Sequence, residues 1–204
     1  LSNWGRSMQL PTLPSLGNLL KKVVYFENFS ELQLRQLIEI GQRKKLKLGE
    51  VLFSENELGD AFYIILSGTV EVRLDRINKH LANLHSGDFF GELALMLGIP
   101  RTATVRATED TVLFAIERSG FKNLLHENPE IYPILIEKLE ERQAELSKYQ
   151  SELQKLGLLD RNEDETNPIS WMQKRINSLF NLSGEKFDNA LQDKRLVFDR
   201  GSLA

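Results

Sequence analysis

The first third of the chain changes from a helical pattern of apolar residues to a strand pattern. Residues 1–13 show no clear period and are interpreted as a lead-in or linker. Apolar residues then recur at helical spacing, at Leu16, Leu19, Leu20, Val23 and Val24. The segment Ser30-Glu31-Leu32-Gln33 has the form of a capping box, with Phe29 and Leu34 as a hydrophobic staple. Two amphipathic helices are therefore predicted, the second ending near Gly41.

From Leu46 to Ile116 the chain reads as short apolar segments between turn residues. The strands predicted from this pattern are 51–53, 61–66, 69–74, 81–84, 104–107 and 112–116. Such even spacing is typical of a small antiparallel barrel or jelly roll, which we place at residues 45–117. A basic run at 43–47 alternates with leucines, and we interpret it as the solvated face of a strand rather than a patch for lipid or nucleic acid.

Past the barrel the pattern is helical again. Asn128-Pro129 can start a long helix that Gly157 can stop. Its heptad seam, in which Arg142 is the one charged residue, consists of Leu135, Leu139, Arg142, Leu146, Tyr149, Leu153 and Leu156. Residues 158–169 are acidic and are interpreted as a linker. A second capping box at 170–173 predicts another helix, followed by a tail to residue 204. The apolar stripe of this second predicted helix needs a partner, which can be the barrel, another subunit or a further domain.

The fold class predicted from these elements is α+β, an antiparallel barrel or jelly roll with N-terminal helices and a long C-terminal helix. A length of 204 residues suits one domain with appendages, and 41% hydrophobic residues can form a core. A net charge of −3 gives no general attraction to nucleic acid or acidic membranes. The absence of cysteine is compatible with a reducing cytosol. The first residue is leucine, which leaves an excised part of a larger protein as one interpretation.

Residues 90–105, reading FGELALMLGIPRTATV, carry the candidate chemistry. Gly91 lets the backbone turn sharply, and the helical turn after it directs its first N–H groups outward, as an anion requires. Pro100 fixes the backbone before Arg101, whose guanidinium can bind two oxygens at once. The Glu92 carboxylate suits a ligand that also carries a hydroxyl, such as a ribose 2′-OH. An ordinary ion pair between Glu92 and Arg101 is the alternative, but six coincident features favour an anion pocket.

This stretch resembles the phosphate-binding cassette of the cyclic nucleotide-binding domain family. The family includes the bacterial catabolite activator, regulatory modules of protein kinases A and G, and cyclic nucleotide-gated channels. The resemblance implies that Glu92 accepts the ribose 2′-OH, Arg101 pairs with the cyclic phosphate, and the Leu93 and Ala94 backbones donate to it. A hydroxyl at Thr102 can form a hydrogen bond with the phosphate and with the amino group of a syn guanine. Both cAMP and cGMP therefore stay as candidate ligands.

The resemblance also implies the remaining contacts of the ligand and a domain spanning residues 14–157, with lid helices over 119–157. The remaining positions of the cassette site are Phe90, Gly91 and Ala103. The base would lie against Val72, Ala82 and Leu84, although ordinary barrel core is an equally good interpretation of these three. Lid candidates are Arg142, Leu146 and Tyr149, for which the alternative is the surface of an imperfect coiled coil. No cofactor is expected, only the nucleotide ligand.

Three classes of function were weighed. An enzyme is disfavoured because the three histidines are scattered and no metal-ligand spacing, nucleophile motif or phosphate loop is present. A DNA-binding regulator would use residues 170–194 as helix-turn-helix, but the basic residues there are offset by acidic ones and no wing strands follow. The third class is a sensor attached to an effector. Segments 128–131, 141–145 and 175–182 resemble bacterial cyclic nucleotide-gated channels related to the small-conductance mechanosensitive channel.

The function predicted is therefore a cyclic nucleotide sensor whose C-terminal helix moves on binding, as the cytosolic part of such a channel. Alternatives are a transcription regulator of the catabolite activator type and the regulatory module of another transporter. The expected location is the cytoplasm, at the inner membrane if the effector is a channel. Expected partners are the nucleotide, a second copy bound through the long helix, and the effector, with no nucleic acid.

Overall fold

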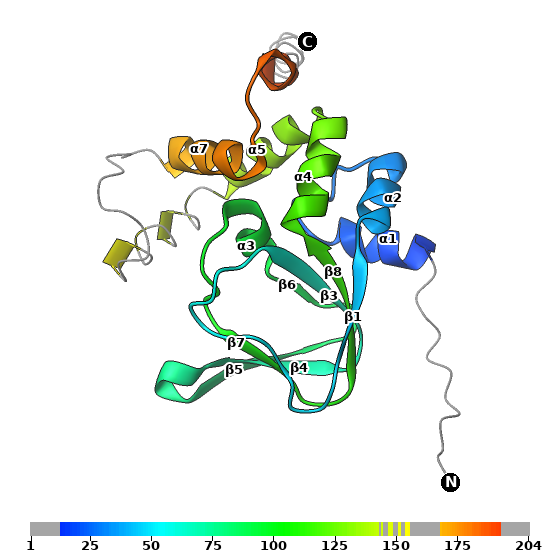
Figure 1. Cartoon of the computed structure of the whole chain (residues 1–204), viewed down its shortest axis with the longest axis vertical. Helices are drawn as coiled ribbons and strands as arrows, with labels where there is room; N and C mark the ends of the chain where they lie inside the picture. Colours follow the sequence, from blue (N-terminus) through cyan, green and yellow to red (C-terminus); the bar gives the residue numbers. More distant parts are fainter. Residues whose placement is uncertain are drawn as a thin grey trace.

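The computed structural model of the chain describes residues 13–142, 144, 147–148, 151, 154–155 and 168–192. Its helices gather at one end of a β-barrel, so that a helical layer lies above two sheets (Figure 1). This is the α+β arrangement predicted from the hydrophobic pattern. Within the described ranges, none of the helices has both the length and the apolar character needed to cross a membrane.

Two antiparallel four-stranded sheets form the barrel. The first has the order β1-β8-β3-β6, with β1 at Gln42–Leu46, β3 at Ala61–Ser67, β6 at Phe89–Phe90 and β8 at Thr111–Glu117. The second has the order β2-β7-β4-β5, with β2 at Val51–Phe53, β4 at Thr69–Leu74, β5 at Lys79–His85 and β7 at Thr104–Ala107. A 3-10 helix, η1 at Asp75–Ile77, joins β4 to β5.

The central strand β3 separates two hydrophobic cores. Because successive side chains of a strand point to opposite faces, Tyr63 and Ile65 lie in the barrel core. Phe62 and Ile64 lie in the larger core under the helices. This explains why β3 is a continuous apolar run rather than an alternating one.

Helices complete the fold: α1 at Leu13–Lys21, α2 at Glu31–Glu39, α3 at Glu92–Leu97, α4 at Arg118–Glu127, α5 at Ile131–Glu141 and α7 at Pro168–Phe180. Residues 185–192 are also helical. The capping box predicted before α2 is confirmed. The Gln33 amide donates to Ser30 Oγ over 3.1 Å, and the Ser30 amide donates to Gln33 Oε1 over 2.9 Å.

The prediction of one long helix over 129–156 is wrong at Arg142. Helix α5 ends at Glu141, and its C-cap Arg142 has φ −103° and ψ 18°, with helical residues following from Ala144. Tertiary contacts hold this end: Arg142 Nη1 donates to the Tyr25 hydroxyl over 3.2 Å, and Lys138 pairs with Glu27. The lid candidates Leu146 and Tyr149 lie outside the described residues.

Helix α7 begins earlier than predicted and packs on this chain. It starts at Pro168, so Ser170 lies inside the helix rather than in a capping box. Pro suits the first helical turn because no intrahelical bond needs its missing N–H there. In the apolar stripe, Met172, Ile176 and Phe180 are buried and Leu179 is partly buried. The Phe180 ring lies 5.6 Å from Phe121 of α4, centroid to centroid. Tyr132 Oη of α5 donates to Asn177 Oδ1 over 2.6 Å. The partner of the stripe is therefore the domain's own helical layer.

Candidate functional site

A cavity of about 180 Å³ lies beside α3, where the segment before β7 returns to the barrel. The residues predicted from the sequence that line it are Val72, Phe90, Gly91, Glu92, Leu93, Ala94, Arg101, Thr102 and Ala103. The other two residues predicted for the base are not among its lining residues. Ala82 lies opposite Val72 in the β4–β5 pairing, and Leu84 packs against the barrel core. The structure thus brings Glu92 and Arg101 to one shared cavity.

Gly91 is the backbone turn that starts α3. Its φ of 85° and ψ of 10° lie in the left-handed region, and it is the N-cap of the helix. A Cβ at this position would lie 2.7 Å from Arg101 Nη1 and 2.9 Å from the Ala61 carbonyl oxygen. The first intrahelical bond runs from the Leu95 amide to the Gly91 carbonyl, over 3.1 Å. The amides of Leu93 and Ala94 precede that bond, so the helix itself supplies no acceptor for them.

Arg101 is the buried cation of the cavity. Its exposed fraction is 6%, and its Nη2 donates to the Ala61 carbonyl over 3.0 Å. Its Nε and Nη1 are buried and have no hydrogen-bond partner among the described residues. The guanidinium is therefore not held in the ordinary ion pair with Glu92 that the sequence left open. Burial lowers the pKa of Arg101, because removal from water disfavours its charged form.

Aromatic rings hold the guanidinium from one side. Arg101 Cζ lies 4.0 Å from the centroid of the Phe53 ring and 5.7 Å from that of Tyr63. Tyr63 in turn stacks on Phe90 with centroids 5.4 Å apart. Ring faces attract cations, so this cluster offsets part of the cost of burying the charge. It leaves Nε and Nη1 unsatisfied, because a ring face accepts hydrogen bonds only weakly.

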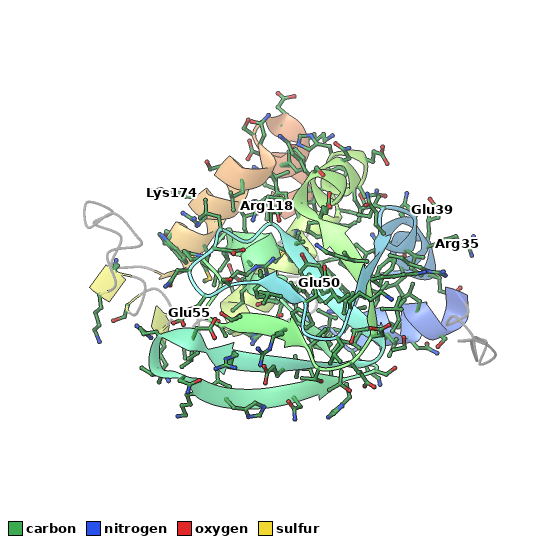
Figure 2. The ribbon with its side chains drawn as sticks, turned by 60° about the horizontal axis from the view of Figure 1, so that its bottom comes forward. Arg35, Glu39, Glu50, Glu55, Arg118 and Lys174 are labelled. Carbon is green, nitrogen blue, oxygen red and sulfur yellow. The ribbon has the colours of Figure 1, made fainter. Side chains whose placement is uncertain are left out.

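Two functional residues were missed by the sequence reasoning. Gly59 lies between the predicted strands 51–53 and 61–66, where the pattern indicates only a turn, yet a Cβ there would lie 2.5 Å from Ala94 Cβ and 2.7 Å from Arg101 Nε. Arg118 donates from Nη2 to the carbonyls of Gly59 and Ala94, over 2.6 and 2.7 Å. Arg118, labelled in Figure 2, is half-buried. Neither role has a local signal, since each depends on contacts with residues distant in sequence.

The lid candidate Arg142 does not line this cavity. Its guanidinium Cζ lies 5.5 Å from the Tyr25 ring centroid, on the segment between α1 and α2. Thr102, by contrast, lines the cavity and is exposed. Among the described residues, no group of three or more His, Cys, Asp or Glu residues could hold a metal ion.

Comparisons with known proteins relate the barrel segment to a known family. Residues 43–128 match the model of the cyclic nucleotide-binding domain family. A cAMP-dependent protein kinase regulatory subunit from Yarrowia lipolytica is 38% identical over 113 residues, which are 54% of this chain and 30% of that protein. The chain spans less than a third of the length of this relative and of the similar regulatory subunits from Blastocladiella emersonii and Drosophila melanogaster.

Two solved structures share the fold. The N-terminal domain of a transcriptional regulator from Streptomyces coelicolor A3(2) superposes with a TM-score of 0.56 and 26% identity, covering 62% of this chain and 93% of that one. A cyclic nucleotide-binding-like protein from Brucella abortus gives a TM-score of 0.51 and 31% identity, covering 54% of this chain and 97% of that one. The matched segment holds the barrel, the cavity and its arginine. Residues 43–128 of this chain therefore belong to the cyclic nucleotide-binding domain family.

Proposed function

We propose that this domain binds a cyclic nucleotide, cAMP or cGMP, in the cavity beside α3, with Arg101 paired to the cyclic phosphate. The observation that carries the proposal is the state of Arg101: a buried cation that lines the cavity with two donors lacking a partner among the described residues. A phosphate oxygen can accept a charge-assisted hydrogen bond from either of these donors. The similar regulatory subunits are named for their dependence on cAMP, which supports the same ligand class.

The remaining contacts follow from positions around that phosphate. The Leu93 and Ala94 amides lie in the first turn of α3 and would donate to phosphate oxygens. The Glu92 carboxylate would accept the ribose 2′-OH, and Val72 would contact the base. Contact of Ala82 and Leu84 with the base stays a prediction, as does closure of a lid by Leu146 and Tyr149.

A thermal shift assay tests the proposal. Because a ligand that binds only the folded state stabilises it, cAMP or cGMP at saturating concentration is expected to raise Tm by several degrees. The control ligands are 5′-AMP for cAMP and 5′-GMP for cGMP, each with the same base and sugar but without the cyclic ester. No change in Tm with either cyclic nucleotide, or an equal rise with the matching 5′-nucleotide, would contradict the proposal. Recovery of hydrolysed nucleotide after incubation would show turnover rather than binding alone.

Glu92→Gln tests the ribose contact. A hydrogen bond to a charged group contributes about 1.5 to 3 kcal/mol, so the variant is expected to bind cAMP roughly 10- to 100-fold more weakly. The control ligand is 2′-deoxy-cAMP, which lacks the hydroxyl and should bind the variant and the original chain equally. Calorimetry with both ligands measures this. An equal loss for cAMP and 2′-deoxy-cAMP would mean that Glu92 does not read the sugar.

Thr102→Ala tests the base contact. If the Thr102 hydroxyl bonds the amino group of a syn guanine, its removal costs about 1 kcal/mol more for cGMP than for cAMP, roughly a fivefold difference in Kd. Because Thr102 is exposed, the fold should be unaffected. Titration with both nucleotides decides the point, and equal effects on the two would refute a role in base recognition.

We infer further that the domain regulates an attached effector by population shift: the ligand must bind one arrangement of the C-terminal helices more tightly than the other. The resemblance of the post-barrel segments supports a mechanosensitive-like channel as effector, with the domain in the cytoplasm and a second copy of the chain as partner. The Streptomyces structure favours a transcription regulator as the alternative. Cyclic nucleotide-dependent ion flux through the full-length protein in vesicles would support the channel. DNA binding that weakens steeply with salt would support the regulator.

A further inference from the structure

The C-terminal end of α3 contacts α7 directly. Arg175 of α7 donates from Nε to the Leu97 carbonyl and from Nη2 to the Gly98 carbonyl, the latter over 3.1 Å. On the next turn of α7, Leu179 lies so close that a Cβ at Gly98 would be 3.1 Å from its Cδ1. Cationic side chains are favourable at a helix C-terminus, where the last carbonyls lack intrahelical donors. Arg175 therefore caps α3 from another element.

Arg118 completes this cap. It donates to the Ala94 carbonyl over 2.7 Å and to the Leu95 carbonyl over 3.3 Å, so that two arginines from different helices bond the carbonyls at this end of α3. A helix of six residues is too short to be stable alone and takes its orientation from its surroundings. Its residues Glu92, Leu93 and Ala94 line the cavity. The arginine cap therefore fixes the orientation of the residues that face the ligand.

We propose that α7 is a positioning element for the nucleotide site: Arg175 holds α3 in its ligand-binding orientation, so that docking of α7 and binding of nucleotide stabilise each other. This inference rests on the proposed function and deepens it. Helix α7 starts at residue 168, beyond the matched family segment that ends at 128, so the family match assigns it no role. By linkage, the coupling acts equally in both directions.

The contacts of α7 allow Arg175 to be removed without undocking the helix. Met172, Ile176 and Phe180 are buried in the core that α7 shares with α4 and α5. The hydrogen bond from Tyr132 to Asn177 also joins α5 to α7. These contacts remain in Arg175→Ala, while the carbonyls of Leu97 and Gly98 lose their donors. The variant thus isolates the link to α3 from the docking of α7.

The experiment compares the original chain, Arg175→Ala and Lys174→Ala by calorimetry with cAMP and cGMP. Lys174 is the matched control, because it is an exposed cation at the preceding position of α7 (Figure 2). We expect Arg175→Ala to weaken nucleotide binding by about 3- to 10-fold, the size of one or two lost hydrogen bonds. Lys174→Ala should bind as the original chain does. Arg175→Lys should fall in between, since an ammonium keeps the charge without the planar fork.

Amide hydrogen exchange of residues 172–180 supplies a readout that a merely structural role would not move. Nucleotide should slow exchange of these amides in the original chain and slow it less in Arg175→Ala. A purely structural Arg175 would lower Tm and leave both Kd and the effect of nucleotide on exchange unchanged, which would overturn the inference. Failure of the original chain to bind either nucleotide would instead overturn the proposed function, so the two failures are distinguishable.

Discussion

Arg101→Ala is expected to weaken cyclic nucleotide binding by about 2 to 5 kcal/mol, or roughly 30-fold to several thousand-fold in Kd, because a buried phosphate would lose its charged partner. The matched control is Arg106→Ala in β7. Arg106 Nε donates to Glu71 Oε1 over 2.7 Å, and the residue does not line the cavity. Calorimetry with cAMP and cGMP measures both variants. Unchanged affinity in Arg101→Ala, or an equal loss in Arg106→Ala, would refute the assignment.

Removing the charge of Arg101 while keeping its stem should do little harm to the ligand-free fold. Truncating a large buried side chain ordinarily costs about 2 to 5 kcal/mol. Here the side chain carries a buried charge with two donors that lack partners among the described residues, and leaving such groups unsatisfied has its own cost. Arg101→Met, which keeps an unbranched stem without the charge, should therefore match or exceed the original chain in ligand-free unfolding free energy. A loss above about 2 kcal/mol would show that Arg101 is chiefly a structural residue.

Gly91→Ala is expected to lower the unfolding free energy by about 2 to 4 kcal/mol and to weaken nucleotide binding at least tenfold. The left-handed backbone costs an alanine about 1 kcal/mol, and forcing a methyl group into a packed site adds about 1 to 3 kcal/mol. At Gly91 that methyl group would lie 2.7 Å from Arg101 Nη1. Relief of this contact requires movement of Arg101 or α3, and both line the cavity.

Gly49→Ala is the matched control for this experiment. Gly49 has φ 82°, close to the 85° of Gly91, but a Cβ there meets nothing within 4 Å. Gly49→Ala should therefore show only the backbone cost, about 1 kcal/mol, with nucleotide affinity unchanged. Denaturant unfolding and calorimetry on both variants separate the backbone cost of alanine from the cost of its contact with Arg101. Equal losses in stability and affinity would contradict the close packing of Gly91 against Arg101.

Much of the barrel could be predicted because its strands alternate or run apolar between turn residues. In β1, four of five residues are exposed, and the strand was indicated only by the basic residues at 43–47 that alternate with leucines. One strand was not predicted, because the two residues of β6 are too few for any period. The break after α5 could not be predicted, since it depends on contacts of Arg142 with Tyr25, 117 positions earlier in the chain.

The site, too, combines residues marked by a local pattern with residues that depend on contacts distant in sequence. Gly91, Glu92 and Arg101 lie in one short stretch, so their spacing and its resemblance to a known cassette were visible locally. Gly59 and Arg118 act on that stretch from other parts of the chain, 59 positions apart from one another. The cap from Arg175 spans 78 positions to Leu97. Such contacts arise only from the packing of helices, and no local sequence pattern predicts them.

The structure of this chain bound to cAMP or cGMP, whichever binds more tightly, tests the central claim most directly. The account predicts that an oxygen of the cyclic phosphate lies within about 2.7 to 2.9 Å of Arg101 Nε or Nη1, the distance of a charge-assisted hydrogen bond. A nucleotide bound elsewhere, or one whose phosphate turns away from Arg101 while both nitrogens keep no partner, would contradict it.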